Sequence, residues 1–475
     1  MAAASNEIST GRVGRRPAQR TIGRISIAAA IVVVLALVAG CDRPAPAAAK
    51  RRDIYLLLVD TLRADHLSLY GYGRRTSPNL DRFAESATVF EHVVAPASWT
   101  LPSVASVLTG LYPSAHGLRA RAHAEDMTAM RPAVKTLAGA LASEGYRTVA
   151  VITNPWLINE EHGLARGFEE YLRLSTVNAP RVNDLARDII SKSDPRPLFL
   201  YLHYMDPHGP FDRHPASDSA ALGPLPAASD RRLTTQERLS MPEYLRLPGK
   251  TDLGTYIEAY DGAIRAWDES FGDLIAWLET RTGRPAPLIA VVADHGEEFT
   301  EHGGWNHGET LYEEQLFVPW VLRLPGRPPR RVSDRVVSLI DVAPTLLAAV
   351  EAPIAETMVG SDVLADDFHP DRPVFAETDV RLGGIRDPRF VQRAVRRGDT
   401  KHIERPSGPE CYDLARDRSE RRSSCAGVSW RERAVADIER WNRENRELAD
   451  LLGPAEAVPL DEEQRERLRS IGYLD

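Results

Sequence analysis

The stretch Ile54-Tyr55-Leu56-Leu57-Leu58-Val59-Asp60 predicts the fold of this chain. Its apolar part is too short for a typical helix, and a continuous apolar run of this length is typical of a strand buried on both faces. Three further runs of this kind lie at residues 148–152, 198–202 and 288–292, with amphipathic segments between them. Buried strands that alternate with helices indicate an α/β domain with a largely parallel sheet.

The segments between these strands predict the main helices. Ser77-Pro78 is expected to open a helix through Ala87, and a second helix is expected over residues 133–144. The longest helix is predicted from about Asp252 to Glu279, because apolar side chains recur there at steps of three and four residues. The segment from His214 to Thr251 is rich in Pro, Ala and Ser, and we expect it to be a long loop over the edge of the sheet.

From about residue 365 the pattern indicates a small α+β subdomain. Short strand-like pieces at 374–376, 390–395 and 401–403 precede a charged helix, which is predicted over about 430–452. The sequence therefore divides into a signal peptide (1–41), a Pro/Ala-rich tether (42–52), a main domain (53–364) and a C-terminal subdomain with its helix (365–475).

Composition excludes one class of partner. The chain has 475 residues, of which 43% are hydrophobic and 27% charged, and this is the composition of an ordinary globular protein. Its formal net charge is -8, whereas a nucleic-acid-binding domain usually carries a basic patch or stripe. We therefore expect no nucleic-acid partner.

The N-terminus has the pattern of an export signal. Five arginines precede an apolar run from Ile25 to Val38, which is short for a membrane span and ends in Val38-Ala39-Gly40-Cys41. This resembles a bacterial lipoprotein signal, which implies a lipid-modified Cys41 and a cell-envelope protein on the periplasmic face of a membrane. The alternative is a single anchor helix in which Cys41 is incidental.

Two further cysteines follow from the same prediction. Export places Cys411 and Cys425 in an oxidising compartment, and they are the remaining pair if Cys41 carries lipid. We predict a disulfide between them. The alternative is two free thiols.

The residues that suggest chemistry follow the strands. Asp60 comes directly after the first strand, and Asp294 with His295 after the run at 288–292. In open α/β sheets ligands bind outside the carboxyl ends of the strands, and carboxylates with an imidazole suit a divalent cation. A lone Asp after a strand is commonly a cap or turn residue. The glycine-studded loop that follows, with His302 and His307, favours a metal site here.

Thr100 is predicted to lie at a helix entrance. It precedes Leu101-Pro102 and a small and aliphatic run, and Pro is favoured at the first helical position. The unpaired amides and the dipole of a helix N-terminus favour negative charge, such as an alkoxide on Thr100 or an anionic substrate group. The alternative is a simple helix cap.

Taken together, several blocks resemble the sulfatase branch of the alkaline phosphatase superfamily, in the order of that family. The resemblance extends from Asp53 to the predicted strand at 411–414 and to the terminal residues 471–474. It rests on Val59–Leu67, the Thr100 region through Gly117, Asp206–Pro210, Asp294–Glu297, Trp305–Glu314 and the later residues Val318-Pro319, Asp341 and Pro344–Leu347.

The resemblance implies an alkaline-phosphatase-like sandwich with a largely parallel central sheet flanked by helices. It also implies one divalent metal ion, either Ca, Mn, Mg or Zn. Asp60, Asp294 and His295 match the positions that bind the metal, and Thr100 matches the nucleophile position that contacts it.

The resemblance implies further catalytic residues. His208 and His307 match positions that hold substrate oxygens or protonate the leaving group, and Arg63 matches a family arginine close to the metal. Each has an alternative as a structural residue, which for Arg63 is that of a carboxylate partner. His203 and His302 are weaker candidates.

The chain departs from the family at the nucleophile. Sulfatases carry Cys or Ser there, which is oxidised to formylglycine, within a C/S-x-P-x-R block, whereas this chain has Thr100-Leu101-Pro102-Ser103-Val104. Threonine cannot give that aldehyde, and Val104 replaces the arginine. Thr61 also follows Asp60 where many sulfatases have a second Asp ligand. A Thr hydroxyl beside a metal is found in relatives that hydrolyse phosphodiesters or transfer phosphoglycerol and phosphoethanolamine.

Three hypotheses about function follow. The first is a metal-dependent hydrolase or transferase of phosphate esters, of the phosphodiester or phosphonate type, with Thr100 as nucleophile. The second is an arylsulfatase-like sulfuric ester hydrolase. The third is a non-catalytic binder of anionic glycans or lipid headgroups. The predicted partners are an anionic ester and, through Cys41, a membrane.

Overall fold

A computed structural model describes residues 52–119, 126–174, 177–211, 219–381, 385–386 and 390–470 of the chain. The predicted signal peptide with Cys41, and the terminal residues 471–474, lie outside the described residues. Residues 51–475 form one compact unit. No helix in the described ranges is both long enough and apolar enough to cross a membrane.

Within the described residues, an eight-stranded sheet lies at the centre of the fold, in the order β12-β2-β11-β8-β1-β7-β5-β6. Neighbouring strands are parallel throughout the run β8-β1-β7-β5-β6, whereas β11 is antiparallel to both of its neighbours. The sheet is therefore largely parallel, as predicted. In sheet order its strands are Arg330–Val332, Thr88–Phe90, Trp320–Arg323, Leu288–Ala293, Ile54–Val59, Leu198–Tyr204, Arg147–Ile152 and Glu170–Arg173.

The four apolar runs of the sequence are the four central strands β1, β5, β7 and β8. Every residue of these strands is buried, because helices cover both faces of the sheet. In the register of β1, Val59 lies opposite Ala293 of β8 and Tyr204 of β7. The carboxyl ends of the strands therefore meet at one edge of the sheet, and the residues that follow them become neighbours.

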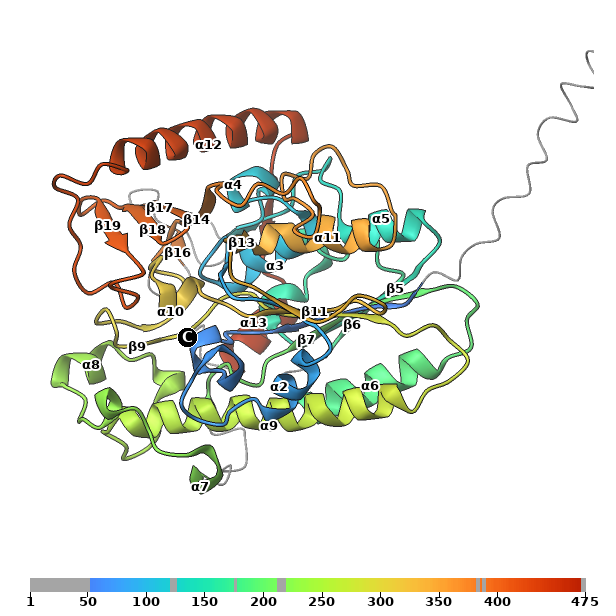
Figure 1. Ribbon diagram of the computed structural model, residues 1–475, viewed down its shortest axis with the longest axis horizontal. Helices are drawn as coiled ribbons and strands as arrows, with labels where there is room; N and C mark the ends of the chain where they lie inside the picture. Colours follow the sequence, from blue (N-terminus) through green and yellow to red (C-terminus); the bar gives the residue numbers. More distant parts are fainter. Residues whose placement is uncertain are drawn as a thin grey trace, which may run out of the picture. The chain divides into compact units, whose positions relative to one another are not determined.

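Helices form a layer on each face of the sheet (Figure 1). One layer contains α3 (Thr100–Thr109), α4 (Pro113–His116), α5 (Leu137–Ser143) and α11 (Val342–Ala349), and the other α2 (Pro78–Ala84), α6 (Ala179–Ser191) and α9 (Leu253–Glu279). Two predicted boundaries were wrong. The helix expected through Ala87 ends at Ala84, because the chain enters β2, and the helix expected from residue 133 begins at Leu137.

The longest helix, α9, has the predicted extent and carries the predicted apolar stripe into the core. Tyr260, Ile264 and Trp267 on this stripe are fully buried. Tyr260 also reaches the edge of the sheet, because its hydroxyl donates to the Thr61 carbonyl oxygen at 2.6 Å. The helix therefore packs against the turn that follows Asp60.

The described part of the segment 214–251 is not the continuous loop that the composition suggested. It contains α7 (Ser219–Leu222), α8 (Thr235–Ser240) and the 3-10 turns 227–229 and 243–245. At the start of α8, the Thr234 hydroxyl accepts from the Glu237 amide, and the Glu237 carboxylate accepts from the Thr234 amide. This capping box stabilises a helix too short to show an apolar period.

The C-terminal region contains a second sheet, which is antiparallel and has the order β14-β17-β18-β19. Its strands are Val374–Thr378, Gln392–Arg397, Thr400–Glu404 and Glu410–Asp413, and α12 (Arg431–Leu452) follows them. Figure 1 shows α12 above this sheet and above α4. Beyond α12, β20 (Ala457–Pro459) pairs with β4 (Asp126–Thr128), and α13 (Glu462–Ser470) follows. The predicted small α+β arrangement is present, packed onto the main domain.

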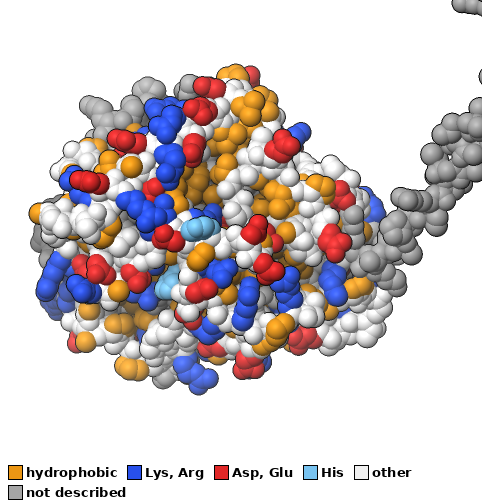
Figure 2. Space-filling view, turned by 45° about the horizontal axis from the view of Figure 1, so that its top comes forward, with side chains coloured by type: hydrophobic (Ala, Val, Ile, Leu, Met, Phe, Trp, Pro, Cys, Tyr) orange, Lys and Arg blue, Asp and Glu red, His pale blue; other side chains and the backbone are white. Residues whose placement is uncertain are grey.

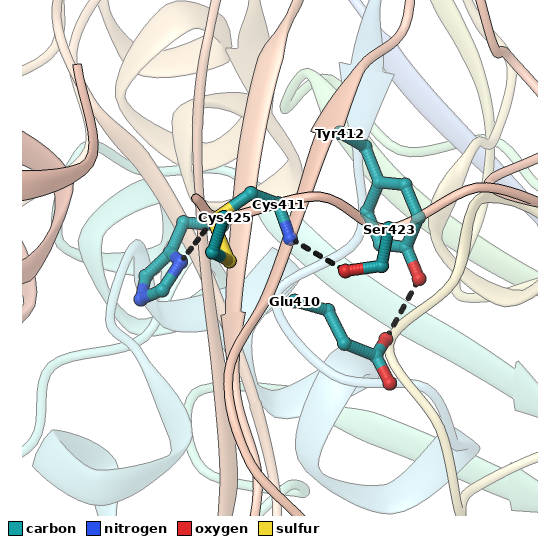
Figure 3. Close-up of a disulfide and its surroundings, with 6 residues drawn as sticks. Glu410, Cys411, Tyr412, Ser423 and Cys425 are labelled. Carbon is teal, nitrogen blue, oxygen red and sulfur yellow. Dashed lines mark hydrogen bonds between the residues drawn. A yellow bond between two sulfur atoms is a disulfide. The ribbon is translucent and has the colours of Figure 1, made fainter. Parts of the chain in front are cut away.

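The predicted disulfide is confirmed. Cys411 in β19 is bonded to Cys425, and their Cα atoms lie 5.0 Å apart (Figure 3). The Cys411 amide donates to the Ser423 hydroxyl at 3.2 Å, so the strand and the returning loop are also joined by a hydrogen bond. The alternative of two free thiols is excluded.

Candidate active site

The site lies at the edge of the sheet where β1 and β8 end. Asp60 follows Val59, and Asp294 and His295 follow Ala293, in strands that are direct neighbours. All three side chains are buried. One ligand atom from each lies within 4.8 Å of the others. The fold therefore brings together the three residues that the sequence predicts as metal ligands.

The contacts of His295 leave one of its ring nitrogens available to a ligand. Its Nδ1 lies 2.8 Å from the Gly296 carbonyl oxygen, an acceptor, so Nδ1 carries the ring proton of the neutral imidazole. Its Nε2 lies 3.6 Å from Asp60 Oδ1 and 3.5 Å from Asp294 Oδ2. These distances are too long for good hydrogen bonds. The three atoms instead surround a common point.

Each carboxylate is only partly satisfied by protein groups. Asp60 Oδ1, Asp294 Oδ2 and Glu297 Oε2 are buried and have no hydrogen-bond partner. Burial raises the pKa of Asp294 to about 7 and that of Glu297 to about 8. Burial, followed by the Asp294 carboxylate, raises the pKa of Asp60 well above its ordinary value. Buried, unpaired carboxylate oxygens beside a neutral imidazole are the donor set of a divalent cation, so these residues fit the metal that the resemblance implies.

Thr100 joins this group as the first residue of α3. Its hydroxyl oxygen lies 3.3 Å from His295 Nε2 and 3.5 Å from Asp60 Oδ2. The sequence places Pro102 at the first helical position, but it occupies the third. Proline is tolerated there because amides of the first turn have no intrahelical acceptor. The Ser103 hydroxyl donates to the Asp294 carbonyl oxygen at 2.7 Å and fixes the helix to the end of β8.

Asn154 is a member of the site that the sequence analysis does not identify. Its Nδ2 donates to Asp60 Oδ2 at 2.6 Å and lies 3.4 Å from the Thr100 hydroxyl. Its Oδ1 accepts from the Trp156 amide at 2.9 Å, which fixes the orientation of the side-chain amide. A signal was present, because Asn154 lies two residues beyond β5, at the same edge of the sheet.

Three histidines surround the group. The ring of His307 lies 4.3 Å from that of His295, and its Nδ1 lies 3.1 Å from Glu297 Oε1. The rings of His208 and His307 lie 5.2 Å apart. His203, a weaker candidate, has its Nε2 3.7 Å from Asp60 Oδ2. The structure thus brings both predicted substrate histidines to the same site.

Burial keeps the imidazoles of His203 and His307 neutral. It lowers the pKa of His203 to about 3 and that of His307 well below its ordinary value, and the neighbouring His295 adds to the second shift. His203, His295 and His307 therefore do not neutralise the carboxylates. Among the described residues, no Lys or Arg forms a salt bridge with Asp60, Asp294 or Glu297.

Arg63 and His302 have other partners. Arg63 pairs with Asp65 at 2.8 Å and with Glu301 at 2.6 Å, and its Nη1 also donates to the Glu297 carbonyl oxygen. These contacts are those of a carboxylate partner. Arg63 contacts the group through the backbone of Glu297. His302 pairs with Glu314 at 2.6 Å and stacks on Tyr312, away from the carboxylates described above.

Comparisons with known proteins add to this geometry. The sulfatase family matches residues 52–352, a range that contains the whole group. The chain is 24% identical over 455 residues to the low-salt glycan biosynthesis sulfotransferase Agl7 of Haloferax volcanii, covering 89% of this chain and 96% of that protein.

Two other similarities involve phosphorus chemistry. The chain is 24% identical over 330 residues to the phosphatidylethanolamine transferase Mcr-2 of Escherichia coli, a match that covers 64% of this chain and about half of that protein, 54%. The phosphonate monoester hydrolase of Agrobacterium radiobacter has a similar structure, with a TM-score of 0.64 at 18% identity, covering 84% of this chain and 96% of that one. This structural likeness shows that the fold is shared.

Proposed function

The chain belongs to the sulfatase family, and on that premise we propose that it is a metal-dependent hydrolase or transferase of phosphate esters with Thr100 as its nucleophile. Family members are hydrolases and transferases, so the class of enzyme follows from membership. The choice of phosphate esters and of Thr100 is the proposal. The observation that carries it is the position of the Thr100 hydroxyl, within 3.5 Å of both Asp60 and His295.

Asp60, Asp294 and His295 are the residues that would hold the metal. A divalent cation there supplies Lewis-acid chemistry, which lowers the pKa of a coordinated oxygen and neutralises charge on a phosphoryl group. The remaining contributions come from the chain itself. The amides at the start of α3 and the helix dipole favour the anionic group of the ester beside Thr100.

The reaction that we propose has two steps. Thr100 Oγ1 forms a bond to phosphorus as the bond to the leaving-group oxygen breaks, and the Thr100 proton passes to Asp60 Oδ2, its nearest carboxylate oxygen. His208 or His307, protonated once the anionic ester is bound beside it, gives a proton to the leaving oxygen. Water or an acceptor alcohol then attacks phosphorus as the bond from phosphorus to Thr100 Oγ1 breaks, which releases phosphate or a new phosphate ester. Thr100 Oγ1 takes back the proton held by Asp60, and the proton of the attacking hydroxyl passes to the histidine that gave one up.

Asn154 has a positioning role in this proposal. Its donor contact with Asp60 Oδ2 holds the carboxylate, and the same amide group lies beside the Thr100 hydroxyl. Because its own orientation is fixed by the Trp156 amide, Asn154 restricts the nucleophile to one position before substrate binds.

A sulfuric ester hydrolase is the second candidate. The relative from Haloferax volcanii, which the chain matches over most of its length, is a sulfotransferase. Against a formylglycine mechanism, Thr100 cannot be oxidised to the aldehyde, and the buried Val104 stands in the place of the family arginine. A sulfatase activity of this chain would therefore use the Thr100 hydroxyl itself or a water held at the metal site.

An activity panel tests the proposal. The substrates are 4-nitrophenyl phosphate, a 4-nitrophenyl phosphodiester, a phosphonate monoester and 4-nitrophenyl sulfate, each supplied to wild type, Thr100→Ala and Thr100→Ser. We expect the highest kcat/KM on a phosphorus ester, loss of turnover in Thr100→Ala and partial activity in Thr100→Ser, which keeps the hydroxyl. Mass spectrometry of quenched wild type is expected to show phosphate on Thr100. Full activity in Thr100→Ala would contradict the covalent mechanism.

We also propose that the chain is an exported lipoprotein held by Cys41 on the periplasmic face of a bacterial membrane. The Val38-Ala39-Gly40-Cys41 pattern supports this, and the Cys411–Cys425 disulfide is consistent with an oxidising compartment. Mass spectrometry of the mature N-terminus is expected to find a diacylated Cys41. An unmodified Cys41 would contradict the proposal.

A further inference from the structure

A polar cavity, separate from the active site, lies between α4, the C-terminal sheet and α12. It has a volume of about 290 Å³ and is lined by side chains from each of these elements. Figure 2 shows the molecule with the top of Figure 1 brought forward, and on this face several Lys and Arg side chains lie beside hydrophobic ones. None of the residues that line the cavity belongs to the group around Thr100.

The arginines of this cavity outnumber its carboxylates by one. Arg119, Arg131, Arg393 and Arg446 line it, against the three carboxylates of Glu377, Asp379 and Asp450. Arg119 is paired with Asp379, at 3.5 Å. Arg131 donates to the carbonyl oxygens of Ala115 and Gly453, which are neutral. The cavity therefore has more positive charge than its own carboxylates neutralise.

Two buried donors of the cavity have no partner. Asn445 in α12 is only 4% exposed, and its Nδ2 lacks a hydrogen-bond acceptor. Arg393 Nε, in β17, is buried and lacks one as well. A buried donor without an acceptor costs on the order of 1–3 kcal/mol, so these two donors favour a ligand that supplies acceptors. Beside arginine side chains, the acceptors that suit these donors best are those of an anion.

Strand β14, which lines the cavity, also forms hydrogen bonds with loops of the active site. The Glu377 amide donates to the Pro96 carbonyl oxygen at 3.0 Å, four residues before Thr100. The Thr378 hydroxyl donates to the Gly308 carbonyl oxygen at 2.6 Å, next to His307. One strand, β14, therefore contacts both loops that carry the reacting residues and also forms a wall of the cavity.

From these observations we propose that the cavity is a subsite for a second anionic group of the substrate, a sulfate, phosphate or carboxylate remote from the ester that reacts. The inference rests on the proposed function and adds a substrate class to it. The substrate is a polyanion, with one charge at Thr100 and another held by Arg393, Arg446 and Asn445.

The test uses pairs of 4-nitrophenyl phosphodiesters. In each pair the second ester arm is an alkyl chain of equal length that ends either in a carboxylate or in a neutral primary amide, and the chain length is varied across the series. At the best length we expect wild type to prefer the carboxylate ester in kcat/KM by about ten- to a hundredfold, the range that a hydrogen bond to a charged group gives. Equal kcat/KM for both esters at every length would overturn the proposal.

Matched variants locate the preference. Arg446 and Arg443 are both exposed on α12, but only Arg446 lines the cavity. In Arg446→Gln the ratio of the two kcat/KM values is expected to fall toward one, whereas Arg443→Gln removes the same charge and keeps the wild-type ratio. Arg393→Gln is the second test variant. Retention of the wild-type ratio in both Arg446→Gln and Arg393→Gln would overturn the proposal.

A binding measurement separates this inference from the proposed function. If wild type hydrolyses neither ester, the proposed function fails, and calorimetric titration with inorganic sulfate decides the subsite. Weaker sulfate binding in Arg446→Gln than in Arg443→Gln and wild type supports an anion site in the cavity. Equal affinity in all three proteins overturns it.

Discussion

The chain contains two buried clusters of carboxylates whose electrostatics are opposite. In the first, Asp60, Asp294 and Glu297 are surrounded by imidazoles that burial keeps neutral. In the second, Glu313 at the start of α10 (Glu313–Leu316) and Glu420 contact two cations, Lys401 and Arg396. Both clusters are almost inaccessible to solvent. They differ in whether cationic side chains neutralise the carboxylates.

In the second cluster each charge has a partner. Lys401 Nζ lies 3.0 Å from Glu313 and 2.8 Å from Glu420, and Arg396 Nη1 lies 2.8 Å from the other oxygen of Glu313. Burial alone would raise the pKa of Glu313, but the two cations hold it below its ordinary value. This cluster is complete without a ligand, and it fixes the C-terminal sheet to α10.

The two clusters differ in what their buried carboxylates indicate about metal binding. Buried carboxylates alone do not indicate a metal site, because a protein can neutralise them with its own cations. Carboxylates that are buried and left without cations either take up a proton, as the raised pKa values of Asp60, Asp294 and Glu297 indicate, or bind a ligand that supplies the positive charge. Removal of one charge is therefore expected to have opposite effects on stability in the two clusters. It should not destabilise the metal-free first cluster, and it should destabilise the second.

The largest expected effect is that of Asp294→Asn on activity. We expect kcat/KM to fall by about a thousandfold or more, because the metal contributes several kcal/mol to the transition state and loses a charged ligand. His307→Ala, which leaves the ligands intact, is expected to lose less. In the metal-free protein the same Asp294→Asn change is expected to leave the melting temperature unchanged or higher, because it removes an uncompensated buried charge.

Metal content by mass spectrometry and melting curves with and without EDTA provide the measurement. Added metal is expected to stabilise wild type, by about 2.7 kcal/mol at a hundred times Kd, and not Asp294→Asn. A lower melting temperature of metal-free Asp294→Asn would contradict the contrast between the clusters.

The second prediction concerns Lys401→Met. Removal of this cation leaves Glu313 and Glu420 with one cation fewer in a buried place, and breaking such a network costs about 3–5 kcal/mol. Urea denaturation at neutral pH measures the change in free energy of unfolding. The double variant Lys401→Met with Glu420→Gln is expected to recover part of the loss. A change below about 1 kcal/mol would show that the cluster does not hold the C-terminal sheet.

The third prediction concerns the disulfide beside the second cluster. Glu420 lies in the loop that Cys411 and Cys425 close, so the disulfide restricts one member of the cluster. Replacing both cysteines by serine is expected to cost about 3 kcal/mol, the chain-entropy value for a loop of about 15 residues. Chemical denaturation of the variant and of wild type gives the difference, and equal midpoints would contradict it.

The smallest expected effect is that of Asn154→Ala, which removes a neutral donor from the first cluster. Loss of its hydrogen bond to Asp60 is expected to lower kcat by about tenfold or more, as for a hydrogen bond to a charged group. Asn159→Ala is the matched control, because Asn159 Oδ1 also caps a turn, at 2.9 Å from the Glu161 amide, but contacts no member of the site. An equal loss in both variants would assign Asn154 a structural role only.

Much of the fold could be predicted from periodicity. The runs that became β1, β5, β7 and β8 are apolar throughout, and α9 carries an unbroken stripe. Two errors have local causes. α8 depends on the Thr234 and Glu237 capping box rather than on apolar spacing, and Pro102 lies at the third helical position because the whole first turn tolerates proline.

The residues of the site that could be predicted are those that come directly after strands. Asp60, Asp294 and His295 come directly after apolar runs, and the structure brings them together. Asn154 also follows a strand, but an Asn near Pro155 indicates an ordinary turn, and only the pairing of β5 through β7 to β1 shows where its amide lies. The contacts of Arg63 with Glu297 and Glu301 depend on the fold of the loop at 294–308, which spacing alone does not determine.

The burial of Val104 has an evolutionary consequence. This residue lies one helical turn after Thr100 and is 1% exposed. An arginine at this position would put a guanidinium into the packed interior, which costs several kcal/mol unless a partner is already present. A natural protein has a reserve of only about 5–15 kcal/mol. A lineage that replaces Thr100 by cysteine therefore gains the residue that can become formylglycine but not the arginine beside it. The substitution of Val104 by arginine then has to pass through a less stable protein. The packing of the core thus acts as a barrier to exchange between the two chemistries.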